Sequence, residues 1–355
     1  MQSSAVLPSK TIDIGVVSVG TKIYLFGGQT GSSSFLNTIQ VFDTTTNIIS
    51  TLTTTLSEVG SQIGVAAVGT NIYLFGGRRR SGTSFVYSST IQVFDTLTNV
   101  ITTLSTTLPS AATSVGVAVI GTNIYLFGGY NGIYSNKIQV FNTQNNTINT
   151  LSTTLSENVY GISCATVGNN IYLFGGYNAS GAFLNTIQVF NAFDNTISIL
   201  STSLATGANS IGSTNVGTKI YLFGGHSANA TYLNTIQVFD TTINTITILP
   251  ITLPLSAYGI GTTNVGARVY LFGGNHGTYL NTINIFTANI PLATNNILIN
   301  EGWQENVFNL LSSPTQVEIS VKNVYRGNSS NIAELQDAYL HNGTSWVNVN
   351  TGETS

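Results

Sequence analysis

The stretch "KIYLFGG" at residues 22–28 returns along the chain with small changes in wording. Its double glycine begins at Gly27, Gly76, Gly128, Gly175, Gly224 and Gly273, so successive copies lie 49, 52, 47, 49 and 49 residues apart by the difference of their numbers. A fixed period near 50 residues is typical of an array of supersecondary units. The sequence therefore predicts a repeat protein rather than a fold with one undivided core.

Each unit is predicted to contain four strands, rich in Val, Ile, Tyr, Phe and Thr. In the first unit they are "IDIGVVSVG" (12–20), "KIYLFGG" (22–28), "TIQVFD" (38–43) and "NIISTL" (47–52). The second strand is apolar on both faces, so each sheet needs a cover on both sides. Six small sheets satisfy that need by closing into a ring, which predicts an all-β, six-bladed β-propeller.

The repeat resembles the kelch motif. The marks of this resemblance are the double glycine, the run "VGTKIYLFGG" and the turn "VFDTTTN", and they extend from residue 11 to about residue 300. The chain departs from the motif in strand three, where Phe replaces Tyr, and in strand four, where aliphatic residues replace a Trp. The residues assigned to the position of this Trp are Ile48, Val100, Ile148, Ile197 and Ile246.

The loop between strands two and three is predicted to carry the function. In an antiparallel meander these 2–3 loops share one rim with the links between blades, and the 1–2 and 3–4 turns share the other. The 1–2 turns are nearly uniform, whereas the 2–3 loops range from "NHGTY" to "RRRSGTSFVYSS". Variation on a shared scaffold places binding on the variable rim.

Several side chains of the 2–3 loops are candidate binding residues. Aromatic rings among Asn, Ser and Gly suit contacts with sugar or protein, although loop tips packed on one another would look the same. Phe35, Phe183, Tyr232 and Tyr279 recur before Leu-Asn and are interpreted as packing residues. The candidates are Arg78, Arg79, Tyr87, Tyr130, Tyr134, Tyr177, His226 and His276, although an arginine run in a loop is often simply solvated.

The two ends of the chain are assigned differently. Residues 1–8 resemble the end of a fourth strand, and we expect them to close the ring as an outer strand of blade six, which gives a propeller over residues 1–300. Residues 301–355 hold six of the 13 acidic residues and both tryptophans, and predict a small β-rich module with a hairpin about Asn342-Gly343. Trp303, Tyr339 and Trp346 are its candidate attachment residues, to be buried on the propeller or on another subunit.

The last 40 or so residues loosely resemble short C-terminal modules in virion proteins of tailed bacteriophages, such as tail and baseplate components. The resemblance rests on "VKNVYRG" and the later "DAYLHNGTSWVNV". It implies a virion protein made in the host cytoplasm, with other virion subunits as partners and a cell-surface glycan as a further candidate. A capping hairpin on the last blade is the structural alternative.

Composition excludes several function classes. Charged residues are 6% of the 355 and the net charge is −3, which provides no footprint for nucleic acid. No apolar run approaches the length of a membrane span. The double glycine ends a strand and opens no helix, so a phosphate-binding loop is excluded.

Enzymatic chemistry finds little support. Kelch-like rings resemble the fold of galactose-oxidase copper enzymes, which need a Cys–Tyr crosslink and histidine ligands, but Cys164 falls in an inner strand as a small buried residue. His226 and His276 follow the double glycine in adjacent blades, and two imidazoles alone rarely form a closed metal site. Asp43, Asp95 and Asp240 alternate with Asn at the 3–4 turn, which indicates turn chemistry.

The sequence therefore predicts a non-enzymatic binding or assembly protein without cofactor or metal. A phage virion component whose variable rim meets a glycan or a neighbouring subunit is the first hypothesis. A cytoplasmic kelch-type protein-interaction module is the second, and a propeller oxidoreductase or glycan-active enzyme is the third.

Overall fold

The computed structural model describes residues 2–288, 325–328, 331–334, 339–341 and 346–348. Contacts divide the chain into two units, Met1–Leu292 and Ala293–Ser355. Among the described residues there is no α-helix, only the short 3₁₀ turn η1 (Ala228–Ala230). None of their helical segments could therefore cross a bilayer.

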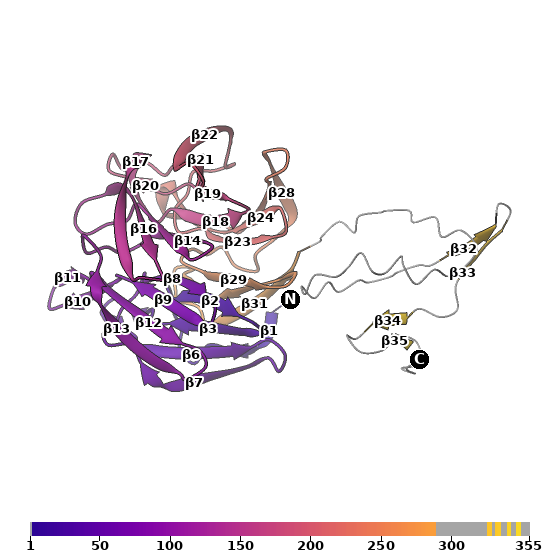
Figure 1. The fold of residues 1–355 in the computed structure, drawn as a ribbon, viewed down its shortest axis with the longest axis horizontal. Coiled ribbons are helices and arrows are strands. Elements are labelled where there is room, and N and C mark those ends of the chain that lie inside the picture. Colours follow the sequence, from indigo (N-terminus) through magenta and orange to yellow (C-terminus); the bar gives the residue numbers. More distant parts are fainter. Residues whose placement is uncertain (1, 289–324, 329–330, 335–338, 342–345, 349–355) are drawn as a thin grey trace. The chain divides into compact units, whose positions relative to one another are not determined.

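The first unit consists of six antiparallel sheets arranged as a ring (Figure 1). Blade one runs outward from β2 (Gly15–Val19) through β3 (Lys22–Phe26) and β6 (Thr38–Asp43) to β7 (Ile48–Thr55). The predicted six-bladed propeller is confirmed.

The other blades repeat this order of an inner strand, a second, a third and an outer strand. Blade two has β8 (Gly64–Val68), β9 (Asn71–Phe75), β12 (Thr90–Asp95) and β13 (Val100–Thr107); blade three has β14 (Gly116–Ile120), β15 (Asn123–Phe127), β16 (Ser135–Asn142) and β17 (Thr147–Tyr160). Blade four has β18 (Ser163–Val167), β19 (Asn170–Phe174), β21 (Thr186–Asn191) and β22 (Thr196–Ser203); blade five has β23 (Gly212–Val216), β24 (Lys219–Phe223), β27 (Thr235–Asp240) and β28 (Thr245–Thr252). Blade six contributes β29 (Gly261–Val265), β30 (Arg268–Phe272) and β31 (Thr282–Thr287).

Short strands decorate the 2–3 loops of several blades. Blade one has β4 (Gln29–Gly31) and β5 (Ser34–Phe35), and blade two has β10 (Arg78–Ser81) and β11 (Ser84–Tyr87). Blade four has β20 (Tyr177–Asn178), and blade five has β25 (His226–Ser227) and β26 (Thr231–Tyr232).

The cores lie between blades, because the second strand is buried on both faces. Tyr24 and Phe26 of blade one both contact Phe94 of blade two, with ring centroids 5.7 Å apart in each pair. The same arrangement joins each blade to the next, and Tyr270 and Phe272 of blade six close it against Phe42 of blade one at 5.8 Å. The phenylalanine of strand three therefore fastens each blade to the blade before it, in a closed series.

The double glycine ends the second strand in a conformation that other residues rarely adopt. Gly27 and Gly28 have φ values of +60° and +104°. A Cβ on Gly27 would lie 2.4 Å from the carbonyl oxygen of Gly60, and one on Gly28 would lie 2.3 Å from Cγ2 of Thr11. Backbone and neighbouring link approach too closely for a side chain, which explains why the pair recurs in every blade.

Blade six takes its outer strand from the N-terminus. Strand β1 (Gln2–Val6) pairs antiparallel with β31, and the Leu7 amide donates to the Asn281 carbonyl at 2.8 Å. The side chain of Leu7 is 1% exposed in the core shared by blades six and one. The N-terminal residues thus occupy the outer-strand position that the sequence assigned to them.

The assignment of strand four is wrong by one position in two blades. Ile48 and Val100 are 63% and 55% exposed. The residues that pack inward are Ile49 and Ile101, which pair with the strand-three phenylalanines as Ile148 does in blade three. In these two blades the residue directly after the turn asparagine is apolar, whereas blades three to five have Thr there, so the first apolar residue was selected instead of its inward-facing neighbour.

The described parts of the second unit are two hairpins. Strands β32 (Tyr325–Asn328) and β33 (Asn331–Glu334) form one, and β34 (Tyr339–His341) and β35 (Trp346–Asn348) form the other. The predicted Asn342-Gly343 turn and Trp303 lie outside the described residues.

Candidate functional site

A closed ring of hydrogen bonds surrounds the central channel at the variable rim. Six residues that precede the inner strands each donate a backbone N–H to the carbonyl of the equivalent residue one blade back, at 2.9–3.2 Å. All six have φ values between +50° and +66°. These residues, called the mouth ring below, are Asp13, Gln62, Ser114, Gly161, Ser210 and Gly259.

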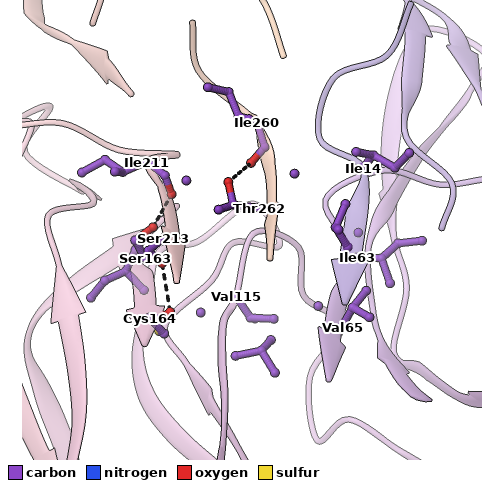
Figure 2. A pocket seen from close by; sticks show the side chains of 18 residues that line it. Ile14, Ile63, Val65, Val115, Ser163, Cys164, Ile211, Ser213, Ile260 and Thr262 are labelled. Atoms are coloured by element: carbon purple, nitrogen blue, oxygen red, sulfur yellow. Dashed lines mark hydrogen bonds between the residues drawn. The ribbon is translucent and has the colours of Figure 1, made fainter. Parts of the chain in front are cut away.

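Below the mouth ring the channel is lined mainly by apolar side chains. The next residues along the chain form a layer of Ile14, Ile63, Val115, Ile162, Ile211 and Ile260, several of which are seen in Figure 2. Glycines follow in five blades, because the neighbouring inner strand packs directly against them; a Cβ on Gly15 would lie 2.4 Å from Cγ2 of Val65. The cavities in the channel measure about 200 and 170 Å³, too small for a polymer to pass through.

Cys164 lines this channel instead of being fully buried as expected from the sequence. It is half-buried and lies beside Ser213, whose hydroxyl donates to the Cys164 carbonyl at 2.9 Å (Figure 2). Burial raises the pKa of its thiol strongly, which disfavours the reactive thiolate. The hydroxyl of Ser163, which replaces the glycine of the other blades, bonds to the Ile211 carbonyl.

The residue after each double glycine lies beside the mouth ring. Its backbone bridges to the residue just before the ring position, as between Thr113 and Tyr130 or between Asn209 and His226. This bridge pins the start of every variable loop to the link between blades. The six pinned residues are Gln29, Arg78, Tyr130, Tyr177, His226 and Asn275.

Charged side chains occupy the blade-two sector of this face. Arg78 and Arg80 both stack on the Phe85 ring, with guanidinium carbons 4.7 and 4.9 Å from its centroid. An Arg78 nitrogen lies 3.9 Å from Oδ2 of Asp13, and Arg79 pairs with Glu58 at 3.5 Å. The three arginines therefore differ in role, and Arg79 is the one held away in a surface pair.

Asp13 is the buried carboxyl of the mouth ring. Its side chain is 9% exposed, and its Oδ2 accepts a hydrogen bond from Gln62 Nε2 at 2.9 Å. Burial raises the pKa of Asp13, while the charge of Arg78 and the Gln62 bond oppose the rise. Gly259 makes room for this carboxyl, since a Cβ there would lie 2.6 Å from Oδ1.

Aromatic side chains fill the rest of the face as a continuous arc. Successive ring centroids lie 4.7–5.8 Å apart, mostly edge to face or tilted. All members are half-buried, so they pack on one another and still present edges to solvent. This aromatic arc consists of Tyr87, Tyr130, Tyr134, Tyr160, Tyr177, Phe183, His226, Tyr232 and Tyr258.

Burial favours the neutral form of several groups in the arc. Burial raises the pKa of Tyr134 and of Tyr160, and the neighbouring phenols raise both further. Burial lowers the pKa of His226, which lies between the rings of Phe183 and Tyr258. The arc is therefore an uncharged surface of ring edges and phenol hydroxyls at neutral pH.

The two candidate histidines do not form a site together. His226 stacks within the arc, whereas His276 is exposed and its Nδ1 lies 2.7 Å from the Ser256 carbonyl oxygen. Within the described residues no group of three or more His, Cys, Asp or Glu side chains is placed to hold a metal ion.

The recurrent aspartates lie on the other rim and shape turns, as the sequence indicated. Asp43 Oδ1 accepts from the amides of Thr45 and Thr46 at 2.8 and 3.3 Å, and Asn142 does the same for Gln144 at 2.9 Å. This is the Asx turn, which aspartate and asparagine form equally well.

Sequence reasoning found the loop aromatics but missed half of the site. Tyr160, Tyr258, Asp13 and Gln62 lie in the links between blades, which were assigned no functional role. The available signal was their position before the first channel glycine or its equivalent, two residues before it for Asp13 and Gln62 and three for Tyr160 and Tyr258, where the blades differ.

Comparison with protein families agrees with the geometry. The KLHDC2/KLHL20/DRC7 Kelch-repeats domain matches residues 13–159 and 161–293. No individual curated protein matches the sequence. The match covers most of the chain and coincides with the six blades, so the protein belongs to the kelch-repeat family.

Proposed function

We propose that this chain is a non-enzymatic binding module that holds its partner against the mouth ring and the aromatic arc. A kelch propeller suggests a protein-interaction module. The observation that carries the proposal is the arc itself, in which nine half-buried rings from different blades form one continuous surface. Rigid aromatic rings provide contact area at a low cost in conformational entropy.

The chemistry of the face favours binding over catalysis. Its buried carboxyl, Asp13, is held by Gln62 and lies near Arg78, and the exposed Glu58 is paired with Arg79, so these carboxyls are positioned by neighbours. The Cys164 thiol lies in the channel, with a raised pKa.

Site-specific crosslinking tests which rim is occupied. Ile133 in a variable loop and Leu97 in a 3–4 turn are 77% and 76% exposed, so they form a matched pair on opposite rims. With a photo-reactive phenylalanine at either position, we expect a discrete crosslinked product in the producing cell from position 133 and none from 97. Equal products, or a product from 97 alone, would place the binding surface elsewhere.

A place in a tailed-phage virion is the finer form of this proposal. Its support is the resemblance of the last 40 or so residues, with Tyr339 and Trp346 on the paired strands β34 and β35. A chain ending at residue 292 is expected to fold as a propeller and to be missing from purified particles that contain the full chain. Unfolding of the shortened chain would instead make the tailpiece a structural cap.

A further inference from the structure

The Arg78 guanidinium, like that of Arg80, has a buried Nε without a partner on the mouth face. It donates no hydrogen bond to the described residues, its Nε is buried without a partner, and its Asp13 contact of 3.9 Å exceeds hydrogen-bond distance. The side chain is 25% exposed. Buried polar groups normally have partners, so an acceptor is expected to join Arg78 when the site is filled.

Arg78 reaches toward the middle of the face. Burial raises the pKa of Tyr87, Tyr160 and Tyr279, and in each case the charge of Arg78 opposes the rise. These tyrosines come from the blade-two loop, the link into blade four and the blade-six loop. Arg78 also pairs with Tyr87 across β10 and β11, and the Tyr87 ring lies 5.6 Å from that of Tyr130, so a group bound to Arg78 would lie near this end of the arc.

The local charge suits one negative group. Arg78 and Arg80 carry two positive charges on one Phe85 ring, and ionised Asp13 cancels one of them. Arg79 is already paired with Glu58, and burial lowers the pKa of His226. A ligand with several clustered carboxylates would lack cations for the remainder.

Other donors and acceptors of the same face also have no partner among the described residues. The hydroxyls of Tyr130, Tyr134 and Tyr177 have no hydrogen-bond partner among the described residues, and neither do the buried amide oxygens of Asn209 and Asn275. Asn209 is 3% exposed. A sugar hydroxyl can donate to an amide oxygen and accept from a phenol at once, so a hydroxyl-rich ligand matches the set.

We propose, building on the binding role above, that the mouth face recognises a carboxylate-bearing sugar residue of a glycan. Arg78 holds the carboxylate, and the phenols and amides of the arc and links hold the hydroxyls. A planar guanidinium pairs with a carboxylate through two parallel hydrogen bonds, which gives this contact its specificity.

The test uses an immobilised panel of hexuronic-acid oligosaccharides and sialosides, each beside its methyl ester. We expect the intact protein to bind at least one acid and to bind the ester about 10- to 100-fold more weakly, as loss of a charged hydrogen-bonded pair implies. Arg78→Gln should weaken acid binding by a similar factor, with Arg78→Lys in between. Arg268→Gln, an exposed arginine at the start of β30 on the other rim, should change nothing.

Three outcomes would overturn the inference: no acid binds, esters bind as well as acids, or Arg78→Gln binds acids like the unmodified protein. Peptides with a free C-terminal carboxylate, tested beside their amides, form a further arm, and a preference for them over sugar acids would also overturn it. Thermal unfolding of each variant separates lost binding from lost fold. If crosslinks at residue 133 persist while sugar acids fail, the binding role stands and the glycan inference falls.

Discussion

The two rims of the propeller are built from the same repeat, yet they differ in how their side-chain polar groups are hydrogen-bonded. On the rim of 1–2 and 3–4 turns, side chains bond within the turns or between the two turns of a blade, as Asp43 does with Thr45 and Thr44 with Thr21. On the variable rim the mouth ring bonds from blade to blade, and several side chains around it are left without partners.

This difference suggests that the turns of one rim serve the fold, whereas the unpartnered groups of the variable rim serve binding. Among the residues that the structure describes, nine buried side-chain polar atoms have no partner, and five of them belong to Ser61, Arg78, Arg80, Asn209 and Asn275 on the variable rim. A fold that satisfies its turns so regularly on one rim could do so on the other. The unmatched groups gather where the sequence varies, which is expected if a partner completes them.

The largest loss of stability is expected from substitution of the double glycine that ends the second strand of each blade. Gly20 and Gly27 have nearly equal φ values, +59° and +60°, but a Cβ on Gly20 meets nothing within 4 Å whereas one on Gly27 meets the Gly60 carbonyl. Gly20→Ala should cost about 1–2 kcal/mol of unfolding free energy, from backbone strain alone. Gly27→Ala should cost more than about 4 kcal/mol, because a backbone oxygen must move. Denaturant unfolding measures both, and equal losses would refute the close-approach explanation.

The next largest loss of stability is expected from changes to the N-terminal strand that closes the ring. Leu7 and Val6 are adjacent in the N-terminal strand and its extension but are 1% and 45% exposed. Leu7→Ala should therefore cost about 2–4 kcal/mol, and Val6→Ala less than about 1 kcal/mol. Deletion of residues 1–8 should lower the melting temperature by at least as much as Leu7→Ala. An unchanged melting temperature would show that β1 contributes nothing to closure.

An aromatic residue from each rim sharpens the comparison further. Tyr134 contacts the rings of Tyr130, Tyr160 and Tyr177, while Phe193 on the constant rim is 87% exposed. Tyr134→Ala should cost about 1–2 kcal/mol, and Phe193→Ala less than about 0.5 kcal/mol. Tyr134→Phe should restore stability, since the hydroxyl has no hydrogen-bond partner among the residues that the structure describes. If Tyr134→Ala were neutral, the arc would not be a packed surface.

The sequence predicted the blades because their packing follows local rules repeated six times. Strand-two residues such as Tyr24 and Phe26 are apolar on both faces, and the double glycine marks the strand end. The site was only half predictable, because the mouth ring depends on hydrogen bonds between residues about 50 positions apart, such as Gln62 to Asp13. No periodicity in a single repeat indicates that the side chains of Tyr160 and Tyr177 will meet.

The smallest expected effect is the pH dependence of stability, which has opposite signs for an aspartate on each rim. Burial raises the folded-state pKa of Asp13, so its contribution to stability is fully present below the unfolded value of 3.8 and is lost as pH rises through the folded value. Bonds from Thr45 lower the pKa of Asp43, so its contribution is present above 3.8 and is lost as pH falls through the lower folded value.

Asn is neutral at both positions and isosteric with Asp. Between pH 4 and 7 the unmodified protein should therefore lose stability relative to Asp13→Asn as pH rises. Relative to Asp43→Asn it should keep a nearly constant difference from about pH 5 to 7 and lose stability at lower pH, where unfolded Asp43 takes up protons. Melting curves of the three proteins across pH 2.5–7 measure both slopes, and slopes of the same sign would contradict the assignment of Asp13 as a buried carboxyl of the mouth ring.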